Sequence, residues 1–443
     1  MKKTSDGIFR HFLSSSSLGG GVWSMGDQSI VSIGNFLLTV ALARTMAHVE
    51  YGGYVVAYGA LYFAHALNNA LVVYPISIRG AHHSRAELRV LASESLIITY
   101  LLALPAGALV GIAVSLVLHR TDLNWLLLGA LLAWQTQETV RRALMAHLRH
   151  RAAIAGDAVT AAVQIGSVAV ALFERIPLNA ASGLKIIMAA SLAGAAVHIA
   201  VLGLGAPILS QLGIRFSQFL KLGRWWLITG IGSCATVLLF PWWLAHRNLA
   251  EAAIYQAMLN IVQVGHPVAF SVGNLVIPAV AHEMLKPHGE AGAKRITLTY
   301  MFQGFLILAP LFLGLLLVPG FVMRVAYGSG SGYTQHTTIL RVLAVGWLAI
   351  YVGHVLNSYA LGKKLVVETA VAQVVSSVVA VLAAALFIPI YGIGGAAIGY
   401  LAMAVGRNCA LMASFAKSKL HRPEHVIHSS VPFAPSRGTV DSD

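Results

Sequence analysis

The stretch AEAAIYQAMLNIVQVGHPVAFSVGNLVIPAVAHE, residues 250–283, decides the fold class. Its charged residues, Glu251 and Glu283, lie at its two ends, and a bilayer-spanning helix needs only about 20 apolar residues. Polar or helix-breaking residues recur in it every three or four positions, which places them on one face of a helix. They are Gln256, Asn260, Gln263, Pro267, Ser271 and Asn274. Polar groups that faced lipid would lack hydrogen-bond partners, so this stripe must face other helices or a water-filled cavity.

The rest of the chain has a similar composition. Of its 443 residues, 57% are hydrophobic and 10% are charged, whereas about 25% of the residues of a soluble protein are charged. Long apolar blocks between short charged gaps predict an all-α polytopic membrane protein with about twelve transmembrane helices. The predicted spans are 22–46, 53–78, 91–118, 125–146, 157–173, 185–209, 225–245, 252–280, 296–318, 337–360, 366–388 and 391–416.

The positions of lysine and arginine predict the orientation of these spans. With the N-terminus inside, most of the 30 cations, Arg407 among them, fall on the inner side, as the positive-inside rule expects. The first apolar block is too long for the hydrophobic region of a signal peptide, which indicates an uncleaved span. Both termini are therefore predicted to be cytoplasmic. The net charge of +14 is then a topology signal, and we expect no nucleic-acid partner.

An internal repeat divides the chain into two halves. Residues 143–184 parallel residues 358–401 at an offset near 214, and this offset shifts the chain by six spans. Two parallel six-helix lobes, with the substrate between them, are an established transporter plan. The predicted divisions are a cytoplasmic N-terminal segment (1–21), an N-terminal lobe (22–209), a cytoplasmic linker (210–224), a C-terminal lobe (225–416) and a cytoplasmic tail whose composition predicts disorder (417–443).

A second stripe runs along the span at 53–78, which occupies in the first half the place that 252–280 occupies in the second. Its members recur every three or four residues and are Tyr54, Tyr58, Tyr62, His65 and Asn69. Hydrogen bonding between packed helices would account for either stripe alone. Because both occur at matching places, we favour a shared cavity that binds the substrate.

Few charges lie within the spans. Asp27 lies about one turn into the first span. Glu138 precedes Arg141 and Arg142 by three and four residues, so these side chains can pair on one helical face. Asp27 and Glu138 are candidates for ion or proton coupling, although an ion pair at Glu138 can equally anchor the end of a helix.

Arginines near the ends of the spans are candidates for attracting anionic head groups, because the guanidinium group binds phosphate in a bidentate manner. The candidates are Arg44, Arg79, Arg141, Arg142 and Arg341. We expect no cofactor, no metal site and no catalytic residues.

Four segments resemble one known family. The run DQSIVSIGNFLLTVALARTMAHVEYG at 27–52 resembles the opening of the polysaccharide-transport (Wzx-like) branch of the multidrug/oligosaccharidyl-lipid/polysaccharide (MOP, MATE-like) flippase superfamily. Three further segments are similar to that branch. They are QETVRRALMAH at 137–147, the opening stretch at 250–283, and MRVAYGSGSGYTQHTTILRVLAVGWLAIYVGHVLNSYALGKK at 323–364.

The resemblance implies two six-helix lobes around a V-shaped cavity, lined mainly by spans 1, 2, 7 and 8, with alternating access. It also implies that the protein flips a polyprenyl-pyrophosphate-linked oligosaccharide across the bacterial cytoplasmic (inner) membrane for O-antigen (lipopolysaccharide) or exopolysaccharide biosynthesis. Its partners would be membrane lipids and the polysaccharide polymerase and glycosyltransferases of that pathway. One departure is that no Arg or Lys occurs in the middle of spans 1, 2, 7 or 8.

Other functions stay open at the level of sequence. A cation-coupled exporter of drugs or organic cations would have the same fold but would need deep carboxylates, of which Asp27 and Glu138 are the candidates. A membrane-embedded polysaccharide polymerase or ligase would need reactive groups on the outer side, where the gaps between spans are short. A scaffold without transport activity is the remaining alternative.

Overall fold

The computed structural model describes residues 15–81, 83–147, 149–287 and 289–420; within its helices, the side chains of residues 15–29, 225, 235–237 and 417–420 lie outside that description. All regular structure in this part of the chain is helical. The first half contains α2 (Ser15–Thr45), α3 (His48–Asn68), α4 (Tyr74–Gly80), α5 (Arg85–Leu118), α6 (Asn124–Ala146), α7 (His150–Phe173) and α8 (Ala180–Leu202). The second contains α9 (Leu212–Arg247), α10 (Leu249–Val262), α11 (His266–Glu283), α12 (Gly289–Leu317), α13 (Pro319–Tyr327), α14 (Thr337–Gly362), α15 (Val366–Tyr391) and α16 (Ile393–Leu420).

Within the described residues, ten helices are long and apolar enough to cross a membrane. Two of these are composite, because α3 continues into α4 and α10 continues into α11. The all-α, multi-pass membrane class is thereby confirmed. The count of twelve and the sides of the two termini stay predictions. The described part of α2 supplies only a shorter apolar helix, Ile30–Thr45, and α6 carries many polar residues, most of which are buried inside the protein.

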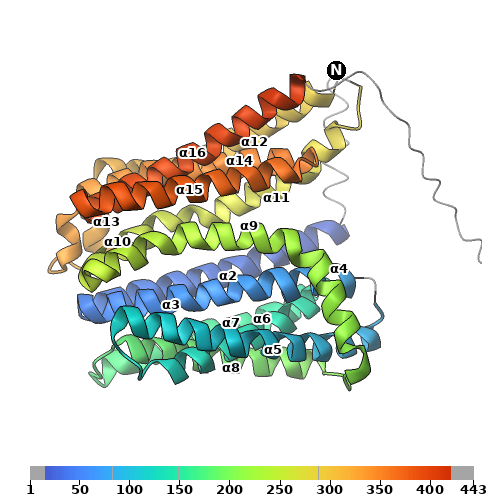
Figure 1. Cartoon of the computed structure of the whole chain (residues 1–443), viewed down its shortest axis with the longest axis horizontal. Helices are drawn as coiled ribbons and strands as arrows, with labels where there is room; N and C mark the ends of the chain where they lie inside the picture. The colour runs from blue at the N-terminus through green and yellow to red at the C-terminus, as the bar shows by residue number, and fades with distance from the viewer. Residues whose placement is uncertain (1–14, 82, 148, 288, 421–443) are drawn as a thin grey trace, which may run out of the picture.

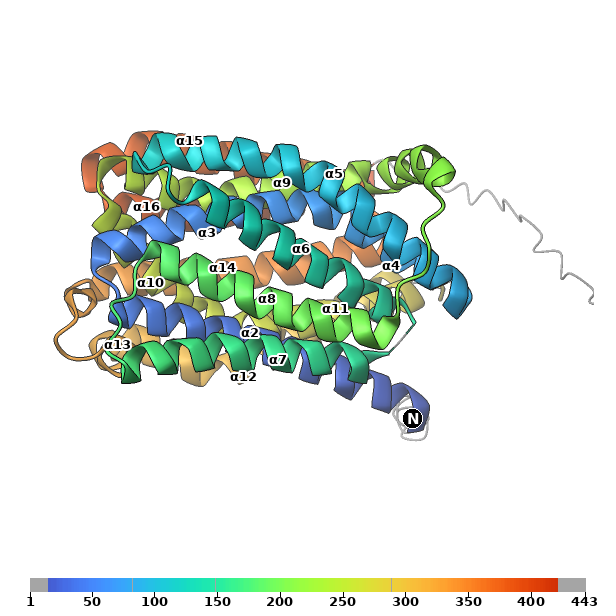
Figure 2. The same cartoon turned by 90° about the horizontal axis from the view of Figure 1, so that it is seen from below.

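The two halves of the chain lie side by side (Figure 1). Helices α2–α8 form one group and α10–α16 the other, with α9 running between them and packing on both α3 and α15. Seen from below, α7 and α8 cover the outside of the first group (Figure 2). The predicted linker, 210–224, is mostly helical, because α9 already begins at Leu212. The helix α16 likewise runs to Leu420, beyond the predicted end of the last span.

Both striped spans are interrupted along their length. A five-residue π-helical segment, Asn69–Val73, separates α3 from α4, and Pro75 follows it at the start of α4. A 3₁₀ turn, Gln263–Gly265, separates α10 from α11, and Pro267 occupies the first turn of α11. Proline is well tolerated there because the amide groups of a first turn have no partner within the helix. The sequence also predicts a bend at Pro278, but α11 continues through that residue.

Candidate functional site

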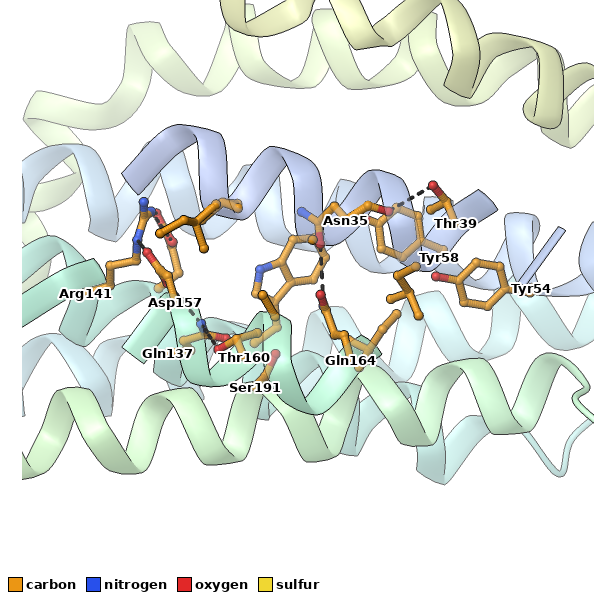
Figure 3. Close-up of a pocket in the computed structure, with 18 residues that line it drawn as sticks. Asn35, Thr39, Tyr54, Tyr58, Gln137, Arg141, Asp157, Thr160, Gln164 and Ser191 are labelled. Carbon is orange, nitrogen blue, oxygen red and sulfur yellow. Dashed lines mark hydrogen bonds and ion pairs between the residues drawn. The ribbon is translucent and has the colours of Figure 1, made fainter. Parts of the chain in front are cut away.

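A cavity lies inside the N-terminal group of helices, between α2, α3, α6, α7 and α8 (Figure 3). It contains about 680 Å³ of empty space, part of which is open to solvent. Most of its polar lining comes from α6 and α7, and α2 faces them across the cavity (Figure 3). Its polar lining residues are Asn35, Thr39, Tyr54, Tyr58, Gln137, Glu138, Arg141, Asp157, Thr160, Gln164 and Ser191.

A network of ion pairs forms one end of this cavity. The Nε of Arg141 donates to Oδ2 of Asp157 over 2.6 Å, and its Nη1 lies 3.1 Å from Oε2 of Glu138. Arg142 donates to the other oxygen of Glu138 over 2.5 Å. The pairing predicted from the spacing of Glu138, Arg141 and Arg142 is therefore confirmed. Because Glu138, Arg141 and Asp157 are all buried, the network lies inside the helix bundle rather than at an exposed helix end.

Hydrogen bonds extend this network along α7. The amide of Gln137 donates to Oγ1 of Thr160 over 2.8 Å, and the amide of Gln164 donates to Asn35 of α2 over 3.5 Å. The sequence analysis missed Asp157, Thr160 and Gln164. A signal was present, because the three residues follow one another at steps of three and four in DAVTAAVQ and so share a helical face.

The aromatic stripe of α3 stacks against α6. Tyr54 and Tyr58 stack with ring centroids 5.8 Å apart, and Tyr58 stacks on Trp134 at 5.9 Å. The ring of His65 also stacks on that of Trp134, with the ring centroids 4.3 Å apart. Tyr54 is buried against Gly183 of α8, whereas Tyr62 is 41% exposed. In this conformation most of the stripe is therefore packed inside the protein, and the ring of Tyr62 is exposed. Asn69, the last member of the stripe, is half-buried.

The polar stripe of α10 and α11 divides into two parts at the 3₁₀ turn. On α10, Gln256 donates to Asn260 over 2.8 Å, and Asn260 donates to the hydroxyl of Tyr51 on α3 over 2.9 Å. Beyond the turn, Ser271 is half-buried and Asn274 is exposed. Gln263, at the turn itself, lines a second cavity inside the C-terminal group. The first part of the stripe thus holds the two groups together, and the second part stays accessible.

Further contacts close the two groups at the same end of the molecule. The hydroxyl of Tyr333, in the turn after α13, donates to the carbonyl oxygen of Ala43 in α2 over 3.1 Å. The ring of Tyr333 also lies 4.6 Å from that of His48. Gly52 packs directly on the backbone carbonyl of Leu249. The topology predicted from the charges places this end on the outer side of the membrane.

No family model and no curated protein matches the chain, but solved structures do. An inward-facing multidrug resistance MATE family transporter of the MOP superfamily matches with a TM-score of 0.70 at 12% identity, covering 88% of this chain and 96% of that one. Lipid II flippase MurJ, in an inward closed conformation, matches with a TM-score of 0.68 at 12% identity, covering 89% of this chain and 87% of that one. An outward-facing MATE family transporter matches with a TM-score of 0.59 at 13% identity, covering 90% and 95%.

The chain has the fold of the MOP-superfamily transporters. The structures that it resembles are those of MATE family transporters and of a lipid II flippase. The Wzx-like branch, the substrate and the bacterial inner membrane stay predictions.

The five candidate arginines do not gather at one mouth of the protein. Arg79, on α4, donates to Gln218 of α9. Arg341, on α14, donates to the carbonyl oxygen of Leu316 over 2.8 Å. Arg44 ends α2 close to Gly328, at the end of the molecule opposite to α4. Arg141 and Arg142 belong to the buried network. Asp27 lies in α2, but its side chain is outside the described residues.

Proposed function

We propose that the protein flips a lipid-linked oligosaccharide of the polyprenyl-pyrophosphate type across a bacterial cytoplasmic membrane by alternating access. The sugar-pyrophosphate head would enter the polar space between the two groups of helices, while the lipid tail stays in the bilayer. Exposed or half-buried members of the stripes, among them Tyr62, Gln263, Ser271 and Asn274, would bind the sugar. Tyrosine rings stack on sugar faces, and amides and hydroxyls bond sugar hydroxyls.

The observation that carries this proposal is that the buried carboxylates are paired with arginines. Among the described residues, the fully buried acids are Glu94, Glu138 and Asp157, and each is bound by an arginine. Glu94, for example, accepts from Arg215 over 2.9 Å. A carboxylate whose charge is balanced by arginine attracts an organic cation much less than a free one. The polar interior therefore suits a neutral sugar with an anionic phosphate better than it suits a cationic drug.

The shape of the molecule supports alternating access. The two groups touch through Tyr51, Asn260 and Tyr333 at the predicted outer end. The accessible part of the α11 stripe, with Asn274, lies toward the other end. The higher structural similarity to an inward-facing MATE than to an outward-facing one is in keeping with this arrangement. Arg44, Arg79 and Arg341 would attract head groups at the two membrane surfaces.

A cation-coupled exporter is the second candidate, because MATE transporters are among the structural neighbours. In that case Asp27 and Glu138 would carry the coupling ion or proton. Drug-sensitivity profiles of a deletion strain separate the two functions. The exporter predicts greater sensitivity to cationic compounds, and the flippase predicts loss of surface polysaccharide with unchanged drug sensitivity.

The stripe itself is tested by replacing Gln263 and Asn274 together with alanine. At normal expression, the lipid-linked oligosaccharide should accumulate in the inner leaflet, and surface polysaccharide should fall. A matched control is Gln303→Ala, because Gln303 is exposed on α12 outside both stripes and both cavities. An unchanged amount of surface polysaccharide in the double variant would show that this part of the stripe does not bind the substrate.

A further inference from the structure

The second cavity lies inside the C-terminal group, between α9, α10, α11, α14, α15 and α16. It contains about 630 Å³ of empty space, including the part open to solvent. This cavity has the same place in the second half of the chain as the first cavity has in the first half. In order along the chain, the helices of the second half that correspond to α2, α3, α6, α7 and α8 are α9, α10, α14, α15 and α16. Its polar lining consists of Ser233, Gln263, His266, Gln373, Ser376, Tyr400 and Arg407.

The only charged group lining this cavity is the guanidinium of Arg407. The sequence analysis assigned Arg407 to the cytoplasmic side, and this assignment stays a prediction. Arg407 lies fourteen residues after the start of α16 at Ile393, about 21 Å along the helix axis. It also falls within the candidate membrane span Ile393–Ala416. A candidate span therefore carries a cation that lines a cavity, and this span is outside the four expected to line the substrate cavity.

Nothing among the described protein groups neutralises this charge. Among the side chains that the structure describes, none forms a hydrogen bond or an ion pair with Arg407, although its Nη2 lies against Gly353 of α14. Its counterpart in the first cavity, Arg141, lies between two carboxylates, Glu138 and Asp157. The two cavities thus differ in charge, since one is balanced within the protein and the other has an uncompensated positive charge.

The sequence explains the difference, because residues 212–420 contain no aspartate and four glutamates, all near helix ends. Glu283 and Glu290 pair with lysines. Glu251 lies beside Gly392, fifteen residues from Arg407 and so about 22 Å away along α16. Glu368 begins α15 and makes no ion pair with Arg407 among the described contacts. None of these four glutamates therefore neutralises Arg407 in this conformation, which leaves its charge open to a partner from outside the chain.

Two amide side chains line the same cavity as the guanidinium. The amides of Gln263 and Gln373 line the cavity without a hydrogen bond to another described residue. Arg407 is half-buried, and an anion in the cavity could accept from the guanidinium and from amide N–H groups in charge-assisted hydrogen bonds. We propose that the C-terminal cavity binds a small inorganic anion at Arg407, with Gln263 and Gln373 as additional donors. Gln263 is also among the residues proposed to bind the sugar, but Arg407 and Gln373 are not, so a test at Arg407 separates this site from the proposed function.

Calorimetry on the full-length protein tests the site directly. The protein is placed in nanodiscs of neutral phosphatidylcholine, in potassium gluconate, and titrated separately with potassium chloride and potassium phosphate. We expect saturable binding of at least one of the two anions. Arg407→Gln should weaken it by about tenfold or more, because a hydrogen bond to a charged group contributes at least that much. Binding of chloride alone identifies a halide site, and binding of phosphate identifies a phosphoryl site.

Two control variants accompany Arg407→Gln. Arg324→Gln removes an exposed arginine at the end of α13 and should leave the affinity for the anion unchanged. Glu368→Gln tests whether the chain supplies its own anion, and it should likewise leave the affinity unchanged. Absence of binding by the wild type, or equal binding by wild type and Arg407→Gln, would overturn the proposal.

The shift in the thermal unfolding temperature gives a second readout of anion binding. In gluconate, Arg407→Gln should leave the unfolding temperature at or above that of the wild type, because Arg407 makes no ion pair with a described side chain, and the added anion should stabilise the wild type only. If Arg407→Gln and Glu368→Gln both lowered the unfolding temperature and no anion stabilised the wild type, Arg407 would be an internal ion-pair partner and the proposal would fail.

Discussion

The amide of Asn260 on α10 donates a hydrogen bond of 2.9 Å to the hydroxyl of Tyr51 on α3. Both residues are buried, and they belong to different halves of the chain. Separation of the halves at this end would break the bond and expose both groups. The Tyr51–Asn260 hydrogen bond therefore stabilises the state in which this end is closed.

Tyr51→Phe removes the acceptor and leaves the buried amide of Asn260 with one bond fewer. Such a loss destabilises the closed state by about 1–3 kcal/mol, which shifts a two-state equilibrium roughly 5–150-fold. Spin labels at Val49 and Gly330, in a variant with both native cysteines replaced, report the separation at this end. The population with the longer distance should grow.

Tyr255→Phe is the matched control for this experiment. Tyr255 is a buried tyrosine on α10 whose hydroxyl has no hydrogen-bond partner among the described residues. Its removal should leave the distance distribution unchanged. Equal shifts in the two variants would mean that ring packing, and not the hydrogen bond, closes this end.

Gly52→Ala should prevent the same closure by steric means. A Cβ at Gly52 would lie 2.0 Å from the carbonyl oxygen of Leu249, which is far inside van der Waals contact. We expect the variant to insert into the membrane normally, to favour the open arrangement at this end and to lose transport. Gly330→Ala adds a methyl group to open space and should retain transport. Full transport by Gly52→Ala would show that tight closure here is dispensable.

Asp157→Ala should strongly destabilise the N-terminal group of helices. Asp157 is buried and accepts from Arg141 over 2.6 Å, and removal of one partner of a buried ion pair reduces stability by about 3–5 kcal/mol. The unfolding temperature in mild detergent measures the effect, and it should drop well below that of the wild type.

Asp122→Ala supplies the comparison at the surface. Arg120 donates to Asp122 over 2.8 Å in the turn between α5 and α6, and this bond lowers the pKa of the Asp122 carboxyl, so the pair is ionised at neutral pH. An exposed pair contributes only about 0–1 kcal/mol. If Asp122→Ala and Asp157→Ala lowered stability equally, the buried network would not be a special source of stability.

Local periodicity predicted what depends on one helix. Apolar blocks located the spans, and the spacing of Glu138 and Arg142 predicted their ion pair, because residues four apart on a helix are neighbours. Pro75 and Pro267 stand in the first turns of α4 and α11, directly after the two interruptions, because proline fits poorly inside a helix. These features follow from helix geometry alone.

The periodicity of the sequence could not predict which residues of different helices contact one another. The partnership of Arg141 with Asp157 joins residues of α6 and α7, and the stacking of Tyr58 on Trp134 joins α3 with α6. Periodicity likewise gave no sign that Arg407 of α16 lines a cavity together with residues of α9, α10 and α15. Packing in three dimensions decides each of these cases.

The central claim is that the protein moves a lipid-linked oligosaccharide between leaflets. The most direct measurement uses proteoliposomes that contain the purified protein and a fluorescent polyprenyl-pyrophosphate oligosaccharide, with a membrane-impermeant reductant added outside. The account predicts that the reductant bleaches the inner-leaflet pool when the wild type is present and spares it with Gly52→Ala. An inner pool that stays protected with the wild type, while the same vesicles transport an organic cation, would contradict the account.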